Sequence, residues 1–185
     1  WDRLAADPAR ASALVQYEPP EGVVWDDATY SGDAYPAYGW ACDVAEVEVD
    51  LDTFETKVTG FWAAVDVGRV INPTLCAGQV EGGTLQAIGW ALTEKLVTRD
   101  GKILNPRMTN YIVPTSLDAP PFTTVLVEAA YSRGPGGAKG VGELPMDGGA
   151  PAVAAAIEHA TALDLDRVPM LPEDLYETYV KGGAR

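Results

Sequence analysis

Hydrophobic and polar residues alternate most regularly between residues 45 and 51. The apolar positions are separated by acidic ones, in the order Ala45, Glu46, Val47, Glu48, Val49, Asp50 and Leu51. A period of two is typical of a strand with one buried face and one solvent-exposed face, and the acidic row most simply forms the exposed face. A second apolar run, KVTGFWAAVD, covers residues 57–66 after a turn near residues 52–55. The two runs therefore predict an antiparallel hairpin.

The sequence Asn72-Pro73 predicts the start of a helix that continues to about residue 95. Asparagine as the N-cap accepts a backbone N–H hydrogen bond, and proline suits the first helical position. Glycines interrupt this helix at Gly78, Gly82, Gly83 and Gly89. Each costs about 1 kcal/mol relative to alanine in an exposed helix interior, so we expect another backbone or a ligand to press closely on the helix. Gln79 and Gln86 lie two turns apart near one face, either as surface amides or as hydrogen-bonding partners of a ligand.

The rest of the chain shows weaker signals for short elements. In chain order they are two helical turns over 2–17 interrupted by Pro8, a hairpin over 96–104 around Asp100-Gly101, an extended crossing over 105–122, a strand over 123–131, an alanine-rich helix over 150–163 and a shorter helix from Pro172. Strands and helices are mixed without a strict βαβ alternation, which predicts an α+β fold. We expect residues 1–185 to form a single lobe of mixed antiparallel hairpins and helices, with 1–20 as an irregular or helical lead-in.

Aromatic residues gather in the stretch 18–39, EPPEGVVWDDATYSGDAYPAYG. Its proline, glycine and aspartate content favours an ordered irregular crossing in which Trp25, Tyr30, Tyr35 and Tyr38 bury large areas. The alternative interpretation is that these rings line a substrate pocket.

Composition narrows the classes of partner. The 185 residues carry 13 Lys and Arg against 27 Asp and Glu, a net charge of −14, which would repel phosphate backbones and anionic lipid headgroups. We therefore expect no nucleic-acid or membrane partner. Apolar runs are shorter than the 18 or so residues that a membrane span needs. Cys42 and Cys76 stand alone with His159 as the single histidine, so no zinc or iron–sulfur site is predicted, and a reducing cytoplasm is expected.

A glycine-rich stretch, GPGGAKGVGE, covers residues 134–143 and ends on Glu143. Glycine tolerates positive φ and close approach, so this loop could bring bare backbone and a carboxylate against a ligand. The alternative is an ordinary loop with a solvated charge. The stretch lacks the Ser or Thr that follows Gly-Lys in a Walker loop, and its glycine spacing does not match a dinucleotide fingerprint.

Three stretches together resemble the C-terminal part of the molybdenum-binding subunit of the xanthine dehydrogenase and aldehyde oxidase family, the molybdenum hydroxylases. They are AEVEVD followed by AVDVGRVINP, then GQVEGGTLQAIGWALTEKL, and finally GAKGVGELP. They occur in the family's order, over about residues 25–175. The resemblance departs from the family's pattern at Asp52-Thr53-Phe54, where family members often have a Thr-Gly turn.

The resemblance implies a molybdenum–pterin cofactor, as molybdopterin or its cytosine dinucleotide, whose metal is held by the pterin and not by protein side chains. Glu143 matches the active-site glutamate, the general base that takes a proton from the water-derived oxygen during hydroxylation. A base in this role is best served by a dry pocket that raises its pKa. Gln79 and the backbone of Lys139, Gly140, Val141 and Gly142 match positions near the cofactor.

The resemblance further implies an oxidoreductase that hydroxylates an electron-poor carbon of a purine, an N-heterocycle or an aldehyde. Electrons would leave through iron–sulfur and flavin (FAD) groups on partner domains or chains, and the isolated chain would be inactive. Two other functions stay open. One is a non-catalytic fragment or small subunit that completes a larger enzyme. The other is a hydrolase that pairs Glu143 with Asp147 or Glu81, which requires carboxyl groups about 5–10 Å apart.

Overall fold

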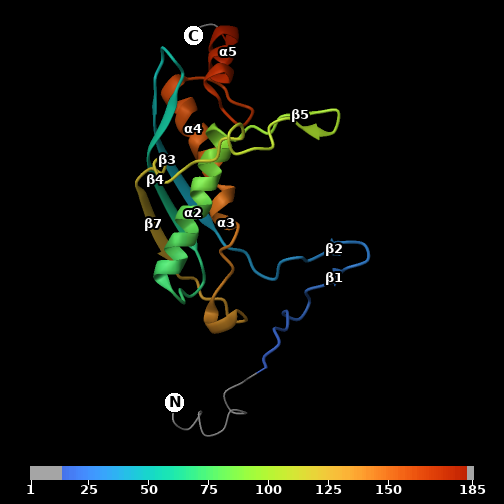
Figure 1. The fold of residues 1–185 in the computed structure, drawn as a ribbon. Helices are drawn as coiled ribbons and strands as arrows, with labels where there is room; N and C mark the ends of the chain where they lie inside the picture. Colours follow the sequence, from blue (N-terminus) through green and yellow to red (C-terminus); the bar gives the residue numbers. More distant parts are fainter. Residues whose placement is uncertain (1–13, 183–185) are drawn as a thin grey trace. The chain divides into compact units, whose positions relative to one another are not determined.

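The computed structural model describes residues 14–182 (Figure 1). Two compact units divide the chain between residues 37 and 38. The predicted helical turns over residues 2–17 fall almost entirely outside the described residues, and residues 14–17 have no regular structure. Within the described residues, no helix has the length and apolar character needed to cross a membrane.

The smaller unit contains one short hairpin, formed by β1 (Trp25–Asp26) and β2 (Ser31–Gly32). The rings of Trp25 and Tyr30 meet edge to face at a centroid distance of 5.9 Å. Tyr30 and Tyr35 are nevertheless 81% and 70% exposed. The expectation that these rings bury large areas is therefore wrong within this chain, because two-residue strands offer no surface broad enough to cover them.

The larger unit is built on a three-stranded sheet in the order β3-β4-β7. The strands are β3 (Ala41–Val49), β4 (Thr56–Asp66) and β7 (Phe122–Val127). The predicted antiparallel hairpin of β3 and β4 is confirmed, with a register shift between Glu46 and Val47. β7 pairs with β4 in parallel and ends at Val127, opposite the last residue of β4, earlier than predicted.

The alternation along β3 has the predicted orientation. Ala45, Val47 and Val49 are half-buried and pack against the hydrophobic core, while Glu46 and Glu48 are exposed. The tight turn that follows is stabilised by Asp50, whose carboxylate accepts hydrogen bonds from the N–H groups of Asp52 and Thr53.

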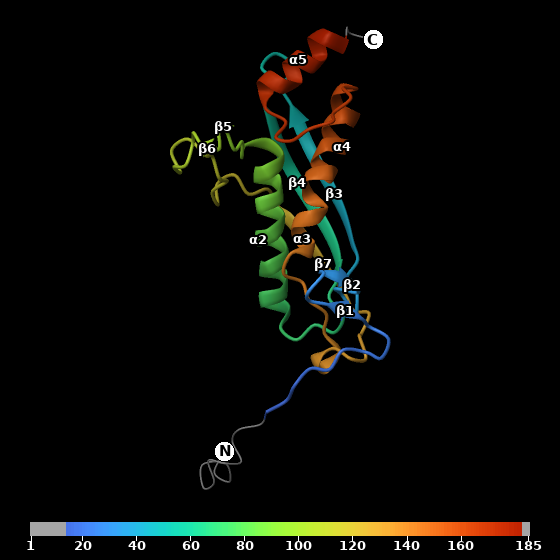
Figure 2. The same cartoon turned by 90° about the vertical axis from the view of Figure 1, so that its right-hand side faces the viewer.

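The predicted long helix is α2 (Pro73–Leu92), which lies against the sheet beside α4 (Gly149–Thr161) (Figure 2). Asn72 Oδ1 accepts the N–H of Leu75 at 3.1 Å, which confirms the expected N-cap. The helix ends at Leu92, three residues earlier than predicted.

The glycines of α2 fall into two groups. A Cβ on Gly83 would lie 3.0 Å from the Pro145 ring, and a Cβ on Gly89 would lie 2.4 Å from Pro114, so close packing within the chain explains both. A Cβ on Gly78 or Gly82 would meet no atom within 4 Å. These two glycines therefore leave a bare strip on the exposed side of α2.

The other elements are short. They are β5 (Thr98–Arg99) and β6 (Lys102–Ile103), the 3-10 turn η2 (Pro135–Gly137), and the helices α3 (Leu144–Asp147), α4 (Gly149–Thr161) and α5 (Pro172–Gly182). The β5–β6 hairpin and both later helices were predicted. Fully buried side chains of β4, α2 and α4 form the core, among them Phe61, Val65, Val80, Val153 and Ile157. The mixed strands and helices confirm the α+β class.

Candidate functional site

The glycine loop, residues 134–142, is attached to the end of β4. Lys139 N–H donates to Val67 O at 2.9 Å, and Arg69 N–H donates to Gly137 O at 2.8 Å. Gly68 lies where the two segments touch, with φ of +66°. A Cβ at Gly68 would lie 2.6 Å from Gly137 O and 2.7 Å from the Lys139 nitrogen, so only glycine fits there.

A buried ion pair reinforces this attachment. The Lys139 ammonium lies 2.6 Å from Asp66 Oδ2 and also donates to Tyr38 O at 3.1 Å. The second carboxylate oxygen of Asp66 accepts the N–H of Gly68 at 2.9 Å. Burial by itself would raise the pKa of Asp66, but the hydrogen bond from Lys139, the amide of Gly68 and the lysine charge outweigh burial and hold that pKa below its usual value.

Beyond Lys139 the loop exposes unpaired backbone donors. The N–H groups of Gly140, Val141, Gly142 and Glu143, called here the amide run, donate to no acceptor among residues 14–182. A Cβ at Gly140 or Gly142 would meet no atom within 4 Å, whereas the side chain of Val141 packs against the core. The loop thus holds its backbone in place through Val141 and leaves open space beside the two glycines.

Gln79 connects the glycine loop to α2. Its Nε2 donates to Gly142 O at 2.7 Å, across 63 residues of sequence. The structure therefore brings Gln79 and Gly142 into direct contact. The neighbours of Gln79 along the exposed side of α2 are the bare glycines Gly78 and Gly82, so one surface continues from the loop onto the helix.

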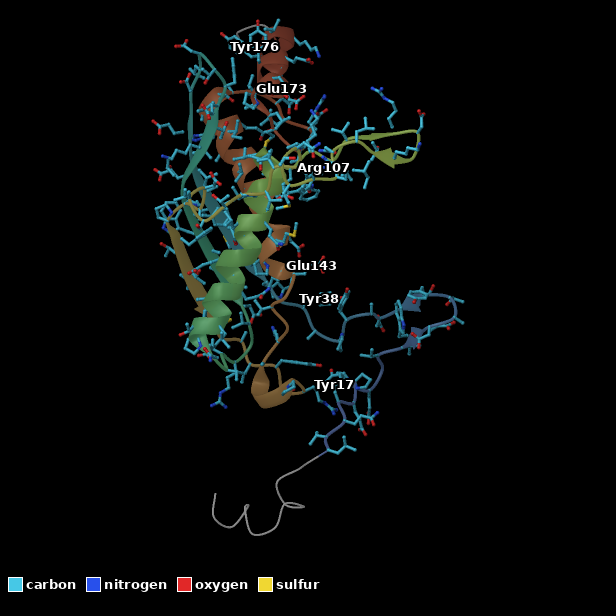
Figure 3. The ribbon with its side chains drawn as sticks, viewed as in Figure 1. Tyr17, Tyr38, Arg107, Glu143, Glu173 and Tyr176 are labelled. Carbon is cyan, nitrogen blue, oxygen red and sulfur yellow. The ribbon has the colours of Figure 1, made fainter. Side chains whose placement is uncertain are left out.

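Glu143 is the residue that leads into α3 (Figure 3). Its backbone oxygen accepts the N–H of Met146 at 2.8 Å. Its carboxylate is exposed and has no hydrogen bond or ion pair with any residue between 14 and 182. The dry pocket expected around a general base is therefore not formed by these residues alone.

The backbone of Lys139 was predicted to lie near the cofactor, but both its N–H and its ammonium form hydrogen bonds within the chain. The predicted positions with a free N–H are Gly140, Val141 and Gly142. Sequence reasoning did not identify Asp66 as part of this site. Asp66 is the acidic residue of the stretch AVDVGRVINP and directly precedes Val67-Gly68. Nothing in the neighbouring sequence indicates that it pairs with a lysine 73 residues away.

A hollow of about 390 Å³ lies further along the same helix. It is lined by Gln86, Trp90, Glu94, Tyr111, Val113 and Met146. Tyr111 Oη donates to Glu94 Oε2 at 2.7 Å, and this hydrogen bond, with burial and the glutamate charge, raises the pKa of Tyr111. Glu143 does not line this hollow.

The chemistry of the site suits a ligand rich in hydrogen-bond acceptors. Four unpaired N–H groups favour phosphate, oxo or carbonyl oxygens, and the bare strip of α2 admits a flat group against the backbone. Residues 14–182 contain no cluster of three His, Cys, Asp or Glu side chains that could hold a metal ion directly.

The family model described as the molybdopterin cofactor-binding domain matches residues 1–120. The xanthine dehydrogenase molybdenum-binding subunit of Escherichia coli O157:H7 is 32% identical over 150 residues, which cover 80% of this chain and 20% of that protein. The chain thus spans about a fifth of the length of this curated relative.

Solved structures also share the fold. The aldehyde oxidoreductase from Desulfovibrio gigas superposes with a TM-score of 0.77 at 30% identity, over 96% of this chain and 19% of that one. The quinoline 2-oxidoreductase from Pseudomonas putida 86 superposes with a TM-score of 0.69 at 35% identity, over 73% of this chain and 18% of that one.

Proposed function

The chain belongs to the molybdopterin cofactor-binding domain family, and from this we propose that it forms one wall of the active site of a molybdenum hydroxylase. In this proposal the glycine loop and the bare strip of α2 face the cofactor, and Glu143 is the general base. The enzyme is an oxidoreductase that hydroxylates an electron-poor carbon with oxygen from water.

The amide run beside an unpaired carboxylate is the observation that carries this proposal. Four consecutive N–H groups without an acceptor would be unfavourable in a closed protein interior, where nearly all backbone donors are paired. In this chain Gly140, Gly142 and Glu143 are exposed, so a ligand that covers the loop in the assembled enzyme must supply the acceptors that water would otherwise provide. The pterin and its phosphate offer such acceptors, and Glu143 then stands at the same end of the ligand as the loop.

Residues of this chain have separate roles in positioning the loop and in proton transfer. Asn72 and Pro73 start α2 so that Gln79 faces the loop, and Gln79 holds Gly142 through its backbone oxygen. This contact orients the amide run toward the ligand. When bound, the molybdenum–pterin cofactor supplies the two-electron redox chemistry. Glu143 accepts a proton at its carboxylate from the water-derived nucleophile, a contribution usually worth about 10²–10⁴-fold in rate.

The substrate of this proposal is a purine, an N-heterocycle or an aldehyde. Relatives with similar sequence or fold are named for xanthine, quinoline and aldehydes, which supports this group of substrates. The cofactor is molybdopterin, alone or as the cytosine dinucleotide. Iron–sulfur and flavin groups on partner domains or chains carry the electrons away. Cys42 and Cys76 are free thiols, which supports a reducing cytoplasm.

Replacement of the base tests the proposal. In the assembled enzyme, Glu143→Gln should keep its molybdenum but lose about 10²–10⁴-fold in turnover per molybdenum, because an amide cannot accept the proton. Glu143→Asp should lose up to about 100-fold, since a shorter side chain misplaces the base by roughly 1 Å.

Asp147→Asn is the matched control, because Asp147 is an exposed carboxylate of the adjoining helix α3. It should turn over at close to the wild-type rate. Near-normal turnover in fully metallated Glu143→Gln would remove Glu143 from the mechanism. Equal losses in Glu143→Gln and Asp147→Asn would show that the effect is not specific to Glu143.

A further inference from the structure

The ion pair between Asp66 and Lys139 is far more buried than the other ion pairs among residues 14–182. The side chains of Asp66 and Lys139 are 8% and 15% exposed, whereas those of Lys95 and Asp174 are 48% and 24% exposed and those of the remaining two pairs exceed 60%. Removing two charges from water is unfavourable unless their geometry and hydrogen bonds compensate for it. The pair is thus a specific feature of the loop attachment and not a surface contact.

Lys139 occupies the last position at which the glycine loop is fixed to the sheet. Its N–H donates to Val67 O, and its ammonium is held by Asp66 and Tyr38 O. After Lys139, the next hydrogen bond from the loop to another element is the one from Gln79 to Gly142 O. The amide run therefore lies between two fixed points, one on β4 and one on α2.

Both carboxylate oxygens of Asp66 accept hydrogen bonds. Asp66 is the last residue of β4, is 6% exposed, and is held by the N–H of Gly68 as well as by Lys139. The carboxylate of Asp66 is thus oriented by the strand end and by Gly68, and the Lys139 ammonium is bound to it.

We propose that Asp66 is a positioning residue for the site. By holding Lys139, it determines where the amide run and Glu143 lie, without touching the ligand itself. This inference rests on the proposed function, since it assigns Asp66 a role through the loop and the base named there.

The test compares Asp66→Asn, Lys139→Gln and the double variant in the assembled, molybdenum-loaded enzyme. In Asp66→Asn, kcat per molybdenum should fall by up to about 100-fold, because displacing a base by roughly 1 Å has an effect of that size. KM should change by less than about twofold, because substrate binding does not use this pair. The double variant should be no slower than the slower single variant, because the two residues act as one unit.

Hydrogen exchange supplies a readout that does not depend on turnover. Peptides that cover residues 134–143 should exchange faster in Asp66→Asn and Lys139→Gln, while peptides of α2 should exchange as in the wild type. Glu128→Gln is the matched control. Glu128 also accepts a backbone N–H at this end of the sheet, from Val70 at 2.8 Å, whereas the Lys139 ammonium bonds to Asp66 and Tyr38 O.

Unchanged kcat in Asp66→Asn, or a loss of kcat without faster exchange of the loop, would overturn the inference. The same losses in Glu128→Gln would also overturn it, since the effect would then be general to this end of the sheet. If Asp66→Asn does not fold, Lys139→Gln carries the test with the same readouts. An active Glu143→Gln enzyme would refute the proposed function, whereas the exchange data would still decide whether Asp66 holds the loop.

Discussion

Gly68 and Gly140 border the same loop but differ in what surrounds them. Gly68 has positive φ and no room for a Cβ beside Gly137 and Lys139, whereas a Cβ at Gly140 meets open space. Contacts within this chain therefore require glycine at position 68. At position 140, only a group outside the described residues could require it.

Alanine at each position separates the two constraints. Gly68→Ala should destabilise the chain by about 1–3 kcal/mol, the usual range for a residue forced into a strained backbone conformation. Gly140→Ala should change the free energy of unfolding by less than about 0.5 kcal/mol, as surface substitutions do. In the assembled enzyme, however, Gly140→Ala should reduce molybdenum content. Thermal unfolding and elemental analysis measure the two effects, and a stable Gly68→Ala variant would contradict the described loop attachment.

Single residues also mark how far local sequence could predict the site. Glu143 and Gln79 stood out because each follows or adjoins glycines, which is a local signal. The partner of the Lys139 side chain could not be predicted in this way, because Asp66 lies 73 residues away in the sequence and is brought near only by the fold. Resemblance placed Lys139 near the cofactor but could not indicate that its N–H was already used.

At the level of elements, the predictions that held depended on neighbouring residues. The β3–β4 hairpin, the N-cap of α2 and the β5–β6 turn are all determined by residues within a few positions of one another. The parallel pairing of β7 with β4 was not predicted, because it joins residues about 60 positions apart and leaves no local pattern. The close approach predicted from the glycines of α2 is confirmed within the chain at Gly83 and Gly89, whereas at Gly78 and Gly82 it stays a prediction.

The two neighbouring glycines of α2 now make different predictions. Gly83→Leu should destabilise the chain itself, because its side chain would meet Pro145, and overpacking typically costs about 1–3 kcal/mol. Gly82→Leu should leave the stability of the chain nearly unchanged, since a Cβ there meets open space. In the assembled enzyme, Gly82→Leu should instead lower the molybdenum content.

Unfolding of each purified variant and molybdenum analysis of each assembled enzyme would test this distinction. Equal destabilisation by both substitutions would show that the packing around α2 is described wrongly. Normal molybdenum content in Gly82→Leu would mean that the bare strip does not face the cofactor.

At the level of the whole molecule, the chain spans about a fifth of the relatives that it matches, and the site is correspondingly open. The carboxylate of Glu143 is exposed, and the amide run has no acceptor among the described residues. We therefore expect the purified 185-residue chain to be inactive and to carry little or no molybdenum. Near-stoichiometric molybdenum on the isolated chain, measured by elemental analysis, would contradict this expectation.

The acceptor of the amide run is the feature on which the proposed function depends most directly. An experimental structure of the assembled, cofactor-loaded enzyme would identify it. We predict that N–H groups of the amide run lie within hydrogen-bonding distance, about 2.7–3.2 Å, of cofactor atoms, with the Glu143 carboxylate facing the metal end. If another polypeptide segment instead accepts these hydrogen bonds and the cofactor lies elsewhere, the loop is structural and the proposed site is wrong.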